Sequence, residues 1–112
     1  MTKRPMALLA AAAICAAAFG GAVAVSSAAG RTVTLKNIAF SPKSLTVSKG
    51  SVVTFAFRDG TTKHNVISGG SRRFKSISTR SSGSQRRTFT RAGTYRYQCT
   101  LHPGMTGRIV VR

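Results

Sequence analysis

Residues 99–105 read CTLHPGM, the stretch that the rest of the chain serves. It places the thiol of Cys99, the imidazole of His102 and the thioether of Met105 in one short segment. Thiolate and thioether are soft metal ligands, and imidazole suits copper as well as zinc. The Pro-Gly pair interrupts regular structure, so the chain must turn there and can fold His102 and Met105 over the sulfur. The stretch therefore predicts a metal site on a tight loop.

The fourth ligand of this site is expected to be His64. His64, Cys99 and His102 are the only His and Cys residues beyond the N-terminal segment. A trigonal His₂Cys set with a weak axial Met is the ligand signature of a blue-copper electron-transfer site. Zinc does not seek a thioether, and iron–sulfur clusters need more cysteines than this chain has. His64, Cys99, His102 and Met105 therefore favour copper.

Each ligand candidate also has a simpler interpretation. Cys99 could be a buried core thiol or could pair between chains, and Met105 could fill a gap in the core. His102 could be a loop residue without a role, and a single histidine such as His64 is weak support by itself. The copper interpretation depends on finding all four together.

The residues before the loop predict a strand. Tyr95, Tyr97 and Cys99 alternate with polar residues, so a strand would point all three toward the interior. Residues 106–111 predict another strand, which would hold the far end of the loop. We expect Tyr95 and Tyr97 to be core residues rather than electron relays.

The remaining chain predicts short strands separated by turns. Apolar residues at positions 33, 35, 38 and 40 predict a strand with a bulge between the two pairs, and residues 51–58 form the clearest strand. A short strand is expected near Phe74, inside the Ser-, Gly- and Arg-rich residues 69–87. Seven or eight such strands predict an all-β fold, a Greek-key β-sandwich.

The core predicted from these strands is small. A domain of roughly 80 residues gains only modest stability from burial, and a metal bound to the native state would add to it. The predicted members are apolar and aromatic residues along the strands: Val33, Leu35, Phe40, Leu45, Val47, Val53, Phe55, Phe57, Val66, Phe89, Tyr95, Tyr97, Ile109 and Val111.

The N-terminal segment differs from the rest. Two basic residues precede an apolar run from Met6 to Phe19, and small residues follow. This is the layout of a secretory signal peptide, with an uncleaved membrane anchor as the alternative. We therefore expect a signal peptide at 1–29 and one copper-binding domain at 30–112. The protein would be exported to the periplasm, the extracellular space or the cell envelope.

The charge of the chain is extreme. The sequence has 18 Lys and Arg against one acid, Asp59, which gives a formal net charge of +17. Such a surface attracts anionic partners, so we expect redox proteins with acidic docking surfaces, and it favours association with an anionic membrane or cell-wall surface. A solvated surface that maintains solubility is the alternative. Export and the lack of an aromatic-basic motif argue against nucleic acid. We expect a monomer.

The run 93–107, together with His64-Asn65, resembles the small blue-copper cupredoxins. The Cys-x-x-His-x-x-Met spacing is most similar to the amicyanin-like branch, and the resemblance covers residues 31–112. It implies a cupredoxin-like fold, one type 1 copper ion and one-electron transfer without bond chemistry, so the protein would not be an enzyme. A copper-storage or copper-delivery protein would use the same ligands and is the alternative.

The resemblance also implies roles for neighbouring residues. The family's Asn after the first His ties that segment to the ligand loop, and Asn65 and Thr100 match this pair; an ordinary strand-edge Asn is the alternative. The family passes electrons through the exposed His of the loop, here His102, within an apolar docking patch. The residues that match this patch are Leu101, Pro103 and Gly104.

Overall fold

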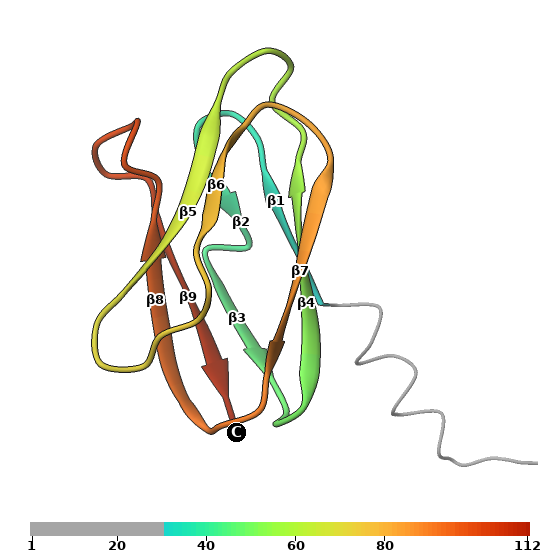
Figure 1. Cartoon of the computed structure of the whole chain (residues 1–112), viewed down its shortest axis with the longest axis vertical. Coiled ribbons are helices and arrows are strands. Elements are labelled where there is room, and N and C mark those ends of the chain that lie inside the picture. The colour runs from blue at the N-terminus through green and yellow to red at the C-terminus, as the bar shows by residue number, and fades with distance from the viewer. Residues whose placement is uncertain (1–30) are drawn as a thin grey trace, which may run out of the picture. The chain divides into compact units, whose positions relative to one another are not determined.

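The computed structural model describes residues 31–112, which form short strands (Figure 1). Side chains along most of these strands alternate between buried and exposed. The predicted signal peptide at 1–29 lies outside these residues. Within the described part, no helix is long and apolar enough to cross a membrane. The strands are β1 (Thr32–Leu35), β2 (Phe40–Ser41), β3 (Ser44–Val47), β4 (Ser51–Phe57), β5 (His64–Gly69), β6 (Ile77–Arg80), β7 (Ser84–Phe89), β8 (Gly93–Gln98) and β9 (Thr106–Val111).

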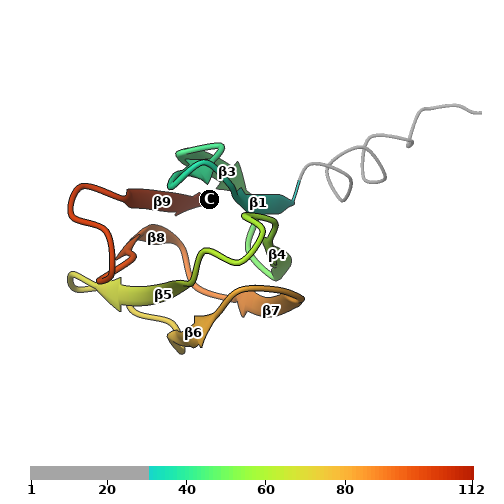
Figure 2. The same cartoon turned by 90° about the horizontal axis from the view of Figure 1, so that it is seen from above.

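The strands form two sheets that face each other, as the view from above shows (Figure 2). One sheet has the order β2-β1-β4-β7 and the other the order β3-β9-β8-β5-β6. The β1–β4 and β3–β9 pairs are parallel, and the other pairs are antiparallel. The predicted all-β sandwich is confirmed.

The core between the sheets contains the residues expected from the alternation. All predicted members are buried except Leu45, which is partly buried and packs against the core. Tyr97 makes edge-to-face contacts with Phe40 and Phe55, with ring centroids 4.8 and 5.5 Å apart. Tyr95 and Tyr97 therefore occupy the predicted core positions.

Gly107 on β9 faces Tyr97 on β8. A Cβ atom at Gly107 would lie only 2.6 Å from the tyrosine ring, so no larger residue fits there without moving the ring. The Tyr97 hydroxyl is buried without a hydrogen-bond partner, and burial raises the pKa of Tyr97. The close packing of this pair joins the inner faces of β8 and β9, the two strands that carry the ligand loop.

The predicted bulge between positions 35 and 38 is wrong. The chain makes a tight turn instead, in which the backbones of Lys36 and Ala39 exchange two hydrogen bonds of 3.1 Å. Asn37 and Ile38 both have left-handed backbones, with φ of 55° and 56°. This turn separates β1 from β2, and nine strands result rather than seven or eight. The apolar pattern misled because the side chain of Ile38 is 52% exposed at the turn.

The strand expected near Phe74 is also misplaced. The structure has β6 at Ile77–Arg80, and Phe74 precedes it in an irregular segment. Hydrogen bonds with Ser68 hold this segment: the Phe74 N–H donates to Ser68 Oγ at 3.0 Å, and the Ser68 N–H donates to Ser76 Oγ at 2.9 Å. Side-chain hydrogen bonds thus replace strand pairing, while the Phe74 ring still packs against the core.

Arg87 gives the Arg-rich region a structural contact. Its Nε donates to the Lys75 carbonyl at 2.7 Å, and one of its terminal nitrogens donates to the Ser76 carbonyl at 3.2 Å. This side chain therefore links β7 to the irregular segment before β6.

Candidate metal centre

The ligand loop between β8 and β9 lies at one end of the sandwich, where β5 begins (Figure 1). Cys99 directly follows β8, and Met105 directly precedes β9, so both ends of the loop are fixed by paired strands. His64 is the first residue of β5. The two sheet neighbours β5 and β8 therefore bring His64 to the loop although 35 positions separate it from Cys99.

The structure brings together the side chains of His64, Cys99 and His102. One potential ligand atom from each lies within 4.8 Å of the others. Nδ1 of His64 is 3.8 Å from Sγ of Cys99, and the two imidazole centroids are 4.8 Å apart. His64 and Cys99 are buried, and His102 is half-buried. These side chains could hold one metal ion.

Met105, the fourth candidate, is buried in the core beside the loop. Two backbone hydrogen bonds place it: the Cys99 N–H donates to the Met105 carbonyl at 2.9 Å, and the Met105 N–H donates to the His102 carbonyl at 3.1 Å. The chain thus closes on itself between Cys99 and Met105, as the Pro-Gly turn predicted.

Asp59 fixes the tautomer of His64. Oδ2 of Asp59 lies 2.8 Å from Nε2 of His64, and because a carboxylate accepts, Nε2 carries the proton. Nδ1, on the side of Cys99, keeps its lone pair for a metal. The hydrogen bond from His64, followed by the one from the Ile38 N–H, lowers the pKa of Asp59. The only acid of the chain is thus held beside a candidate ligand.

Sequence reasoning missed this role of Asp59, because an Asp-Gly pair after a strand is typical of a turn. Two signals could have found it. Asp59 is the sole acid among 18 basic residues, and it precedes His64 by five positions. A buried metal-binding His commonly donates its second N–H to a carboxylate or a carbonyl.

His102 has its own acceptor. Its Nε2 lies 3.1 Å from the backbone carbonyl of Lys63, which can only accept, so this nitrogen also carries the proton. Nδ1 of His102 is then free to bind a metal. Both imidazoles are therefore held in the tautomer that offers Nδ1, one by a carboxylate and one by a carbonyl.

Asn65 joins the ligand loop to two strands. Its Nδ2 donates to Thr100 Oγ1 at 2.8 Å and to Thr79 Oγ1 at 3.3 Å, and its Oδ1 accepts the Thr100 N–H at 2.9 Å. Asn65 is buried, so these bonds are shielded from water. The contact expected between Asn65 and Thr100 is present in the structure.

The outer side of the loop is open to solvent. Leu101 is 46% exposed, and Pro103 and Gly104 are exposed on the other side of His102 in the sequence. Gly104 has a φ of 87°, a left-handed backbone that favours glycine at this turn. The residues expected to form an apolar patch are thus exposed on both sides of His102 along the chain.

The donor set fits one type 1 copper ion. Two imidazoles with fixed tautomers and a buried thiol meet at one place, and a buried thioether stands at the end of the same loop, which is the ligand type that copper proteins of this class use. Burial excludes water, and the outer hydrogen bonds from Asp59 and Asn65 orient the donors before any metal binds.

Comparison with known proteins gives a match to one family model. The model of a cupredoxin-like domain matches residues 5–111. No curated protein sequence matches the chain.

Among solved structures, a reduced Cu(I) form of an amicyanin variant at pH 4 is 28% identical, with a TM-score of 0.61 and coverage of 72% of this chain and 80% of that one. A purple cupredoxin from Nitrosopumilus maritimus is 21% identical, with a TM-score of 0.65 and coverage of 72% and 98%, and at this identity it supports the fold alone. A copper-containing nitrite reductase from Thermus scotoductus is 29% identical, with a TM-score of 0.66. The match covers 72% of this chain but only 22% of that reductase.

Proposed function

Because the chain belongs to the cupredoxin-like family, we propose that it is an exported one-electron carrier whose ligands are His64, Cys99, His102 and Met105. Bound copper supplies the Cu(II)/Cu(I) couple. The observation that carries this proposal is the approach of His64 Nδ1 to Cys99 Sγ, while Nε2 of the same ring is engaged by Asp59. A ring held in this way can offer only one nitrogen to the site.

The chain's own residues would keep the site rigid during electron transfer. Cys99 would bind as the thiolate, because a cationic metal lowers the pKa of a coordinated thiol. The backbone bonds between Cys99 and Met105 and the Asn65–Thr100 pair hold the loop in place. Donors that stay in place in both oxidation states keep the reorganisation on each transfer small. Met105 would be the weak axial ligand that tunes the potential.

Electrons would enter and leave through His102. Its half-buried ring reaches toward the surface beside exposed Leu101, Pro103 and Gly104. An apolar patch allows a partner to approach closely without removing water from charged groups. We infer that redox proteins dock here, and that basic side chains around the molecule steer their acidic surfaces toward it.

An enzymatic role is not part of the proposal. In residues 31–112, the group His64, Cys99 and His102 is the only cluster of three or more potential His, Cys or acidic ligands. The sequence contains no further histidine for a second, His-rich copper site. The nitrite reductase match covers 22% of that protein, so it supports a shared domain rather than a shared reaction.

We also propose where the carrier works and in what form. Residues 1–29 would direct export and 30–112 would form the copper domain, working as a monomer in the periplasm, at the cell envelope or outside the cell. The basic surface would also bring it to anionic membranes or cell-wall polymers. Nucleic acid is not among the proposed partners.

Electron self-exchange tests the carrier proposal against copper storage or delivery. Mixtures of the oxidised and reduced protein should exchange electrons rapidly in NMR line-broadening measurements, while a mild chelator removes copper slowly. Leu101→Glu, which places a charge in the patch, should slow self-exchange, and Thr90→Glu, an exposed site outside the loop, provides the matched control. Slow self-exchange with rapid loss of copper would contradict a carrier and favour delivery.

A further inference from the structure

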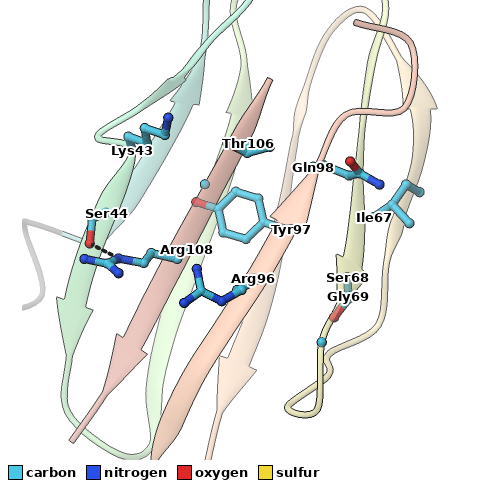
Figure 3. Close-up of a pocket in the computed structure, with 12 residues that line it drawn as sticks. Lys43, Ser44, Ile67, Ser68, Gly69, Arg96, Tyr97, Gln98, Thr106 and Arg108 are labelled. Atoms are coloured by element: carbon cyan, nitrogen blue, oxygen red, sulfur yellow. Dashed lines mark hydrogen bonds between the residues drawn. The ribbon is translucent and has the colours of Figure 1, made fainter. Parts of the chain in front are cut away.

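The outer face of the five-stranded sheet contains a hollow of about 570 Å³ (Figure 3). Strands β3, β9, β8 and β5 contribute to it, and its lining includes the side chains of Lys43, Arg96 and Arg108. These arginines point outward because Tyr97 and Ile109, their neighbours along the strands, point into the core. We call this hollow the basic groove.

Two arginines of the basic groove face each other directly. Arg96 on β8 is the register partner of Arg108 on β9, and Gly69 and Ser44 continue the same row on the outer strands. Directly opposite residues lie close together on the same face of a sheet, so like charges there destabilise the sheet. Arg96 and Arg108 thus place two like charges opposite each other at the centre of the groove.

No acidic side chain of the chain relieves the repulsion. Asp59 is the only acid in the sequence, and it is hydrogen-bonded to His64. This contact lies at the end of the sandwich that holds His64, Cys99 and His102, which we call the metal end. Instead, a neutral contact positions Arg108, whose Nε donates to Ser44 Oγ at 3.0 Å (Figure 3). The Arg108 N–H also donates to the Lys43 carbonyl at 2.9 Å, which fixes the backbone of a third cation beside the groove.

The basic groove adjoins the ligand loop. The row next to the arginine pair contains Gln98 and Thr106, which are register partners. Gln98 directly precedes Cys99, and Thr106 directly follows Met105, so the floor of the groove continues into both ends of the loop. A molecule bound in the groove would therefore lie beside the metal centre.

We propose that the basic groove binds a carboxylate-rich segment of the redox partner, an inference that rests on the proposed electron-carrier function. Guanidinium groups form paired, charge-assisted hydrogen bonds with carboxylates, and Arg96 and Arg108 have no acidic partner within the chain. A membrane or wall polymer would be attracted by the overall charge and would gain nothing from lying next to the ligand loop. A partner that exchanges electrons gains both proximity and orientation.

The test is an NMR titration of isotope-labelled, Cu(I)-loaded protein with a short polyglutamate peptide at about 0.1 M salt, where long-range attraction is screened. The amides of Arg96, Gln98 and Arg108 should shift most. The double variant Arg96→Gln/Arg108→Gln should weaken binding by about tenfold or more, since it removes both paired contacts. The control Arg86→Gln/Arg91→Gln removes the same charge at exposed sites outside the groove and should weaken binding by less than about threefold.

Three results would overturn the proposal: equal weakening by the two double variants, shifts scattered over the surface, or displacement of the peptide by polyphosphate that binds the same groove more tightly. The last result would assign the groove to a phosphate polymer. The amide chemical-shift changes of the wild-type protein identify the binding site even if a variant folds poorly. The visible band of the protein after oxidation to its Cu(II) form reports separately on the copper site. If the Cu(II) form is coloured but no peptide binds, the groove alone is refuted, and a colourless Cu(II) form refutes the electron-carrier function.

Discussion

The metal end and the basic groove lie on the same two strands, β8 and β9, and they treat polar groups in opposite ways. At the metal end, Asp59 and Asn65 have hydrogen-bond partners at 2.8 Å, and the only acid of the chain is placed there. In the groove, Arg96 faces Arg108 without any acidic neighbour. The chain thus pairs its polar groups around the candidate metal ligands and leaves charge unpaired in the groove, where an anion can bind.

Removing the Cys99 sulfur should have the largest effect, a loss of the stability that copper adds at the metal end. Copper bound at about a thousand times its Kd would add about 4 kcal/mol to the stability of the native state, or about 15–30 °C in Tm for a domain of this size. Cys99→Ser should abolish most of that gain. Calorimetry with and without copper measures it, and an equal gain in the variant would show that copper binds elsewhere.

Breaking the Asn65 tether should have the next largest effect. Asn65→Ala removes the hydrogen bonds to Thr100 and Thr79 and should cost about 1–3 kcal/mol in the unfolding free energy of the copper-free protein. Gln98→Ala, which removes an exposed amide from the groove, is the control and should change stability by less than about 0.5 kcal/mol. Urea unfolding gives both values, and equal costs would contradict the contrast.

Neutralising Asp59 tests the electrostatic part of the metal end. A carboxylate beside His64 favours the more positive oxidation state, so Asp59→Asn should raise the reduction potential by about tens of millivolts while retaining an acceptor for Nε2–H. Cyclic voltammetry measures the potential. Thr61→Asn, an exposed site nearby, provides the control, and a lowered potential in Asp59→Asn would contradict the assignment.

The same difference should depend on pH in one direction. Hydrogen bonds from His64 and Ile38 lower the pKa of Asp59 below its ordinary value of 3.8, so the carboxylate is ionised throughout the neutral range. As pH falls through this lowered pKa, the carboxylate is protonated and its charge is lost, together with the stability that the ionised form contributes above the unfolded pKa. The difference in reduction potential between wild type and Asp59→Asn should therefore persist near neutral pH and disappear only in acid, as voltammetry at several pH values would show.

The smallest expected effect concerns the groove, where a substitution should raise the stability of the protein instead of lowering it. Arg96→Gln removes the like-charge pair and should stabilise the copper-free protein by about 0.2–1 kcal/mol at low salt. The gain should fade at about 1 M salt, where charges are screened. Arg86→Gln, whose register partner is Thr54, controls for the general loss of positive charge. An equal gain in stability in both variants would show that Arg96 and Arg108 do not repel each other measurably in the groove.

Local spacing allowed much of this account to be predicted from the sequence. The alternation up to Cys99 and the Pro-Gly turn determine the ligand loop, because neighbours along a strand and a turn are near in space whatever the rest does. The core members followed for the same reason. The tight turn before β2 was missed, because an exposed Ile38 looks the same in sequence as a buried one.

Features that depend on distant parts of the chain could not be predicted in this way. The contact of Asp59 with His64 requires the shape of the turn between β4 and β5, and the opposition of Arg96 and Arg108 requires the register of β8 against β9. Neither appears in local periodicity. Phe74 packs into the core without a strand because Ser68 supplies its hydrogen bonds.

The absorption spectrum of the Cu(II)-loaded protein tests whether Cys99, His64 and His102 bind one copper ion. If the thiolate of Cys99 and the imidazoles of His64 and His102 share one copper ion, charge transfer from sulfur to copper should give an intense visible band, and Cys99→Ser should lack it. A colourless wild-type protein that has nevertheless taken up one equivalent of Cu(II) would contradict the account.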